Sequence, residues 1–128
     1  MESKEKQYIL LKWGLSLKLI VEKNKTLVQD RKAQGIRDKN IINSFGRLEA
    51  ASGIPKATLV NISLGRKNAA STTWTAILEA LDMSMADFGQ VFDSIKETEV
   101  LFYKDELENA RKERARAKNA RRKKAGGL

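Results

Sequence analysis

The fold is decided by residues 44–65, which read Ser-Phe-Gly-Arg-Leu-Glu-Ala-Ala-Ser-Gly-Ile-Pro-Lys-Ala-Thr-Leu-Val-Asn-Ile-Ser-Leu-Gly. Ser44 is a favoured N-cap and Gly53 is a favoured helix stop, so the stretch between them is predicted to be helical. A second short helix is predicted over 56–64, where it begins beside the proline and closes at the last glycine. Two short helices joined by a glycine-containing turn form a helix-turn-helix arrangement.

Helices are also predicted on both sides of this stretch, because apolar residues recur there at intervals of three and four. One helix is expected over 8–23, another over 71–81, and a third after the capping box that Ser84 and Asp87 can form. The residues predicted to face inward, including those of the motif, are Leu10, Trp13, Leu17, Ile20, Val21, Leu48, Ala51, Leu59, Ile62, Trp74, Ile77, Leu78, Leu81, Phe88, Val91, Phe92 and Ile95. No strand-turn-strand pattern is present, so the predicted fold class is all-α.

Two other stretches are less regular. Residues 24–43 are rich in polar side chains and contain Gly35, which predicts a loop or short irregular helices. After residue 85, either one long helix runs outward, or the chain bends near Ser94, where a second capping signal occurs, and restarts. Further on, apolar residues recur at coiled-coil spacing for little more than one and a half heptads: Val100, Tyr103, Leu107 and Ala110.

The charge of the chain is concentrated at its C-terminal end. The 128 residues include 25 Lys and Arg against 16 Asp and Glu, a formal charge of +9. Residues 111–128 hold nine basic residues and one acidic residue, so this tail carries +8 and the preceding 110 residues carry +1. Composition therefore predicts a nearly neutral body with a strongly basic tail.

Several classes of function are excluded by composition. The chain has no Cys and no His, so it lacks disulfides, thiolate zinc sites, Cys nucleophiles and imidazole bases. We therefore expect no enzyme, no metal and no cofactor. No apolar run is longer than four residues, as at Tyr8–Leu11, and the N-terminus is polar, which predicts neither a membrane span nor a signal peptide. A reduced, cytoplasmic and nucleoid-associated setting fits these features best.

Residues 44–88 resemble the phage repressor/Cro-type (XRE) helix-turn-helix family. The matching features are the cap and leucine of the opening (Ser44, Leu48), the turn Gly53-Ile54, the core pair Leu59 and Ile62, the closing Gly65-Arg66-Lys67-Asn68, and the two segments Thr73–Leu81 and Met83–Phe88. The resemblance implies a compact five-helix repressor-like DNA-binding domain over 1–95, with the motif at 44–65 and an insert at 24–43. It is followed by a charged C-terminal helix and basic tail over 96–128.

One departure from the family concerns Glu49, which stands where the family usually has an Ala packed against the recognition helix. An unpaired buried carboxylate is costly, so we expect this side chain to point outward or to find a partner.

The physics of the motif identifies the side chains that would touch duplex DNA. A recognition helix presents its N-terminal, outward residues to base edges in the major groove. With Leu59 and Ile62 inward, the candidate base contacts are Lys56, Ala57, Val60 and Asn61. Lys56 can donate to guanine, Asn61 can pair with adenine, and the two apolar side chains can touch a thymine methyl group. The candidate phosphate contacts are Ser44, Thr58, Arg66, Lys67 and Asn68.

The resemblance thus implies a small transcriptional regulator of repressor type that acts as a homodimer on double-stranded DNA, with recognition helices about 34 Å apart. Two alternatives remain open: an antitoxin-like DNA-binding module that binds a partner protein through 94–118, or a protein-interaction adaptor that does not bind DNA. The basic tail has three interpretations. It is an arm that binds nucleic acid, a solvated helix end, or a segment that folds back on the acidic segment of its own chain or of a partner.

Overall fold

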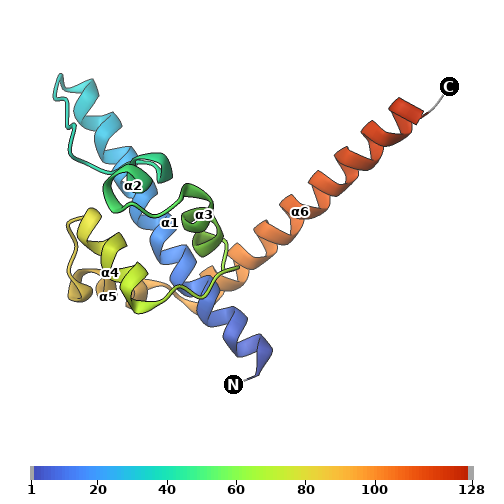
Figure 1. Cartoon of the computed structure of the whole chain (residues 1–128), viewed down its shortest axis with the longest axis horizontal. Coiled ribbons are helices and arrows are strands. Elements are labelled where there is room, and N and C mark those ends of the chain that lie inside the picture. Colours follow the sequence, from blue (N-terminus) through green and yellow to red (C-terminus); the bar gives the residue numbers. More distant parts are fainter. Residues whose placement is uncertain (1, 127–128) are drawn as a thin grey trace.

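Helix α1 (Ser3–Ala33) runs through the body of the molecule, and α3, α5 and α6 all pack against it (Figure 1). The computed structural model describes residues 2–126, and over this range the elements after α1 are α2 (Phe45–Ser52), α3 (Lys56–Ser63), α4 (Ser71–Ala80), α5 (Met85–Ser94) and α6 (Glu97–Gly126). The predicted all-α fold class is confirmed. Among these described helices, none is both long enough and apolar enough to cross a membrane.

The helix ends of the motif follow the signals in the sequence. The hydroxyl of Ser44 accepts a hydrogen bond from the amide of Arg47 at 3.1 Å, as expected of an N-cap. Gly53 ends α2 with φ 76°, a left-handed conformation that glycine adopts without strain. Ser84 and Asp87 form the predicted capping box at the start of α5, through two hydrogen bonds of 3.0 Å. The predicted elements around residues 44–94 are therefore confirmed.

The prediction of a loop or short irregular helices over 24–43 is wrong for its first part, because α1 continues without a break to Ala33. The side chain of Asn24 donates to the carbonyl oxygen of Ile42 at 2.9 Å, which ties the extended helix to the returning chain. The helix ends only where Gly35 adopts φ 81°. Lys, Gln and Arg are good helix formers, so the helix continues even where no apolar stripe marks it.

The main core lies between α1 and the four short helices. Its buried side chains are Leu17, Ile20, Val21, Leu48, Leu59, Ile62, Trp74, Ile77, Leu78 and Phe88. The Trp13 ring lies 5.0 Å from the Trp74 ring and 5.2 Å from the Phe88 ring, centroid to centroid, so the aromatic residues form one packed cluster. Ala51 is predicted to face inward but is exposed, because the half-buried Phe45 and Ser52 lie on one side of Leu48 around the helix and Ala51 lies on the other.

The chain does bend near Ser94, which selects the second of the two predicted arrangements. Ile95 has an extended conformation and α6 starts afresh two residues later. Ser94 is not the cap of the new helix, because its hydroxyl donates to Val91 in the preceding turn. The cap is supplied by Glu99, whose carboxylate accepts a hydrogen bond from the amide of Lys96 at 3.2 Å.

A second apolar cluster joins the first part of α6 to α1. Val100 and Tyr103 are buried there against Leu11 and Leu15, together with Ile95. The short apolar seam of α6 is therefore covered at its start by α1 of the same chain.

Helix α1 approaches the C-terminal end of α3 closely at Gly14. A Cβ atom at this position would overlap the carbonyl oxygen of Ile62 and would lie 2.7 Å from that of Ser63. Glycine inside a helix costs about 1 kcal/mol relative to alanine, so helix propensity alone disfavours it. At this site the missing side chain is what allows α1 to cross α3.

We expect Gly14→Ala to destabilise the protein by about 1–3 kcal/mol, because the backbones must separate to admit the methyl group. Gly89→Ala in α5 is the matched control, since nothing lies within 4 Å of a Cβ at that position. That variant should gain about 0.5–1 kcal/mol from helix propensity. Urea unfolding monitored by circular dichroism measures both changes, and equal effects of the two substitutions would contradict the close contact.

Candidate nucleic-acid interface

Helix α3 presents two different sides. Leu59 and Ile62 are 0% and 2% exposed and face the core. Lys56, Ala57 and Asn61 are exposed, and the last two lie one helical turn apart on the same side. Val60, the fourth predicted base contact, is half-buried. The predicted inward residues are therefore inward, and three of the four candidate base contacts are on the free surface.

The first turn of α3 is anchored by Glu49. Its carboxylate accepts a hydrogen bond from the backbone amide of Lys56 at 2.6 Å, across the turn between the two helices. The N-cap residue of α3 is Pro55, which makes no side-chain cap, so the carboxylate from α2 takes that role. Glu49 is also exposed. Both expectations for this residue are met, and its charge is favourable at a helix N-terminus.

The predicted phosphate contacts do not form a single cluster. Ser44 is exposed at the start of α2, where its hydroxyl serves as the cap, and Thr58 is half-buried on α3. Arg66 lines a hollow that it shares with α6, including Arg111 and Arg114. Arg66 thus lies beside α6 rather than with the other candidates.

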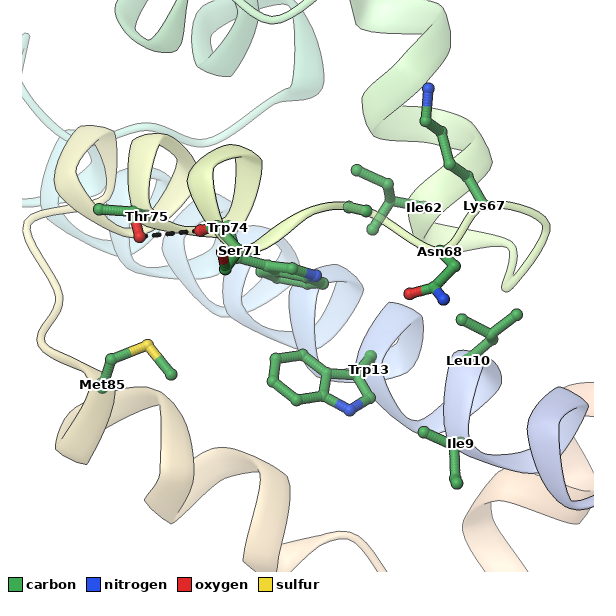
Figure 2. Close-up of a pocket in the computed structure, with 11 residues that line it drawn as sticks. Ile9, Leu10, Trp13, Ile62, Lys67, Asn68, Ser71, Trp74, Thr75 and Met85 are labelled. Carbon is green, nitrogen blue, oxygen red and sulfur yellow. Dashed lines mark hydrogen bonds between the residues drawn. The ribbon is translucent and has the colours of Figure 1, made fainter. Parts of the chain in front are cut away.

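Lys67 and Asn68 border a cavity of about 510 Å³ beneath the α3–α4 connection. Figure 2 shows Trp13 and Trp74 forming its walls, with the carboxamide of Asn68 turned toward the cavity and the side chain of Lys67 extending away from it. Met85 stands at the opposite edge of the cavity in this view. Of these two candidates, Lys67 is the one whose side chain is directed outward.

The C-terminal end of α3 is fixed by a residue of α6. The hydroxyl of Tyr103 donates a hydrogen bond to the carbonyl oxygen of Ser63, forty residues earlier in the chain. Tyr103 is only 3% exposed, and burial raises the pKa of its hydroxyl to about 12, with smaller contributions from Glu22 and Glu106. The hydroxyl therefore stays protonated and can donate at any ordinary pH. In the sequence Tyr103 belongs to a short apolar seam, and no local pattern indicates this bond.

Tyr103→Phe should destabilise the protein by about 1–3 kcal/mol at pH 7, because a buried carbonyl oxygen loses its partner. The folded-state pKa is about 12 and the ordinary value is 10.0, so the wild-type contribution is complete below pH 10 and is lost between pH 10 and 12. The stability difference between wild type and variant should shrink across that window. Urea unfolding at several pH values measures it, with Tyr8→Phe as a control expected to change stability little at pH 7. A constant difference from pH 9 to 12 would contradict the assignment.

The part of the chain that the structure describes holds no group of three His, Cys, Asp or Glu side chains placed to bind a metal ion. No protein-family model, curated protein sequence or solved structure matches the chain. The geometry of the helices and the distribution of charge are therefore the basis for assigning a function.

Proposed function

We propose that the protein is a non-enzymatic transcriptional regulator of repressor type that binds a specific sequence in double-stranded DNA through α3. The observation that carries the proposal is the two-sided α3, whose outward side is free while both of its ends are anchored by other helices. A short helix that is rigidly held and open on one side fits the major groove, which is about 12 Å wide.

In this proposal the N-terminal part of α3 meets base edges. Lys56 would donate to guanine and Asn61 would make two hydrogen bonds to adenine, while Ala57 and Val60 would contact thymine methyl groups. Thr58 lies on α3 itself, and Ser44, Lys67 and Asn68 lie in the segments that flank it, where phosphate contacts set the register without reading sequence.

Charge supports this orientation. Residues 45–67, which include α2 and α3, hold four basic residues and one acidic residue. Residues 68–110 hold nine acidic residues and two basic residues. A polyanion attracts the first segment and repels the second, so DNA would approach from the α2–α3 side.

The test of the proposal is Lys56→Ala combined with Asn61→Ala. A good bidentate base contact contributes about 1–3 kcal/mol, so affinity for the preferred site should fall at least tenfold and the preferred sequence should become less defined. Selection of bound sequences from random duplex DNA, followed by titration of the best site, measures both. Lys23→Ala with Asn109→Ala is the matched control, since both side chains are exposed and lie on α1 and α6. If Lys56→Ala with Asn61→Ala leaves the preferred sequence and the affinity unchanged, the proposal is wrong.

A second copy of the chain is the partner that we propose for the exposed apolar side of α6. Leu101 and Phe102 are 48% and 66% exposed. Phe102 borders a hollow whose lining includes Leu15 and Leu19 of α1 as well as charged residues such as Lys18 and Glu22. Phe102 and this hollow lie on the same surface. Two copies related by a twofold axis could therefore each insert Phe102 into the hollow of the other. Such a dimer would carry two recognition helices, as DNA half-sites require.

Phe102→Ser should weaken the dimer about tenfold or more, because buried aromatic anchors dominate interface energies. Ile36→Ser is the control, since Ile36 is 47% exposed and lies in the loop that follows α1. Sedimentation equilibrium measures the dissociation constant of each variant. A monomeric wild type, or equal effects of the two substitutions, would contradict the homodimer. Co-purification of a different protein that Phe102→Ser releases would favour the antitoxin-like alternative instead.

A further inference from the structure

The last part of α6 leaves the body of the molecule. Figure 1 shows the helix continuing well beyond α1–α5 toward the C-terminus. Over residues 111–124 every side chain is exposed. Nine of these fourteen residues are basic: Arg111, Lys112, Arg114, Arg116, Lys118, Arg121, Arg122, Lys123 and Lys124. Residues 127–128 of the basic tail lie outside the described residues.

This segment, the basic arm (residues 111–124), has no apolar side with which to pack against protein. Its uncharged residues are Ala115, Ala117, Asn119 and Ala120. Each residue turns about 100° around a helix, so the basic residues are distributed around the whole circumference. Like charges four residues apart, such as Arg114 and Lys118, repel one another. An anionic partner would relieve this repulsion.

The basic arm is not neutralised by the body. The ion pairs among the residues in the structure are Lys18 with Glu22 and Arg31 with Asp38, both outside α6. The basic arm contains one acidic residue, Glu113, and the next closest in sequence, such as Glu108 and Asp105, lie in the first part of the same continuous helix. A continuous helix cannot fold back on itself, so the basic tail does not fold back on the acidic residues of its own chain.

The basic arm begins beside the end of α3. Gly65 and Arg66, directly after α3, share one hollow with Glu108, Arg111 and Lys112 of α6. The hydrogen bond from Tyr103 to Ser63 fastens the two helices together just before this point. A duplex that contacts α3 is therefore near the root of the basic arm.

We propose that the basic arm is a second DNA-binding element, which contacts the phosphates of the duplex that α3 reads and adds affinity without sequence preference. As an α-helix it spans about 20 Å. Over that length duplex DNA presents about twelve phosphate charges, at one per 1.7 Å of its axis. The proposal rests on the proposed function for its choice of duplex DNA as the partner.

Other anionic partners fit the basic arm less well. Binding at a membrane surface depends on a helix with an apolar side, which these residues lack. Exposed ion pairs with an acidic protein contribute little each, whereas phosphate contacts release condensed counterions. Duplex RNA has the same phosphates but a narrow major groove that excludes side chains, and α3 favours DNA for that reason.

The experiment measures the salt dependence of DNA affinity for the full chain and for the triple variant Arg116→Gln, Lys118→Gln and Arg121→Gln. Each phosphate contact contributes about 0.9 to the slope of log affinity against log salt concentration. If all three contacts are lost, the slope falls by about 2.7, and the wild type should lose about 40-fold more affinity than the variant between 50 and 200 mM salt. Affinity for preferred and random duplexes should fall by the same factor.

The matched control replaces three exposed lysines elsewhere by glutamine, at Lys4, Lys23 and Lys96. This variant has the same net charge as the triple variant, so a wild-type slope in the control assigns the effect to the basic arm. An unchanged slope in the triple variant would overturn the proposal, as would an equal fall in the control. Tighter binding to an RNA duplex of equal length, or to vesicles of phosphatidylserine, would overturn the choice of DNA.

The two proposals fail differently. If α3 does not read DNA, the double substitution at Lys56 and Asn61 leaves affinity and preferred sequence unchanged, whatever the salt slope shows. If the basic arm does not bind phosphate, the preferred sequence persists and the triple variant keeps the wild-type slope.

Discussion

The position of α3 depends on the contact between its last carbonyl groups and two other helices. Gly14 lets the backbone of α1 approach those carbonyls, and Tyr103 of α6 binds one of them. At the other end, Glu49 of α2 binds the first amide. An isolated helix of eight residues is too short to be stable in water, so α3 owes its direction to these contacts. The outward side of α3 is presented rigidly because its two ends are held.

The elements that sequence analysis located correctly are those whose signals act over a few residues. Ser44 caps an amide three residues later, and Ser84 and Asp87, which are also three residues apart, form a capping box. Gly53 determines a turn through its own dihedral angle. The inward direction of Leu59 and Ile62 follows from helical spacing once the bounds of α3 are known. These local signals are sufficient to predict α2–α5 and three of the four positions expected to be exposed on α3, Val60 being half-buried.

The features that could not be predicted from the sequence depend on contacts between distant parts of the chain. Nothing near Tyr103 in the sequence indicates that its hydroxyl binds the carbonyl oxygen of Ser63. In the sequence Gly14 is only a residue that weakens a helix, and its contact with the backbone of α3 is known only from the structure. The continuation of α1 to Ala33 was missed because that segment has few apolar residues to mark a helical face. Arg66 was grouped with Lys67 from their adjacency in sequence, but it lies beside α6. Such placements require the tertiary structure.

Because α6 is continuous, it separates the acidic part of the chain from the basic arm in space. Its first part, 97–110, has five acidic residues against one basic residue and begins against α1, whereas the basic arm projects outward. A flexible tail of the same composition could return to these acidic side chains, but a continuous helix keeps the two charges apart. The positive charge is therefore concentrated on the basic arm, and its field would orient the molecule before contact with a polyanion. Since the body itself is almost neutral, such orientation would come mainly from the basic arm, and the few exposed side chains of α3 would then select among the sequences encountered.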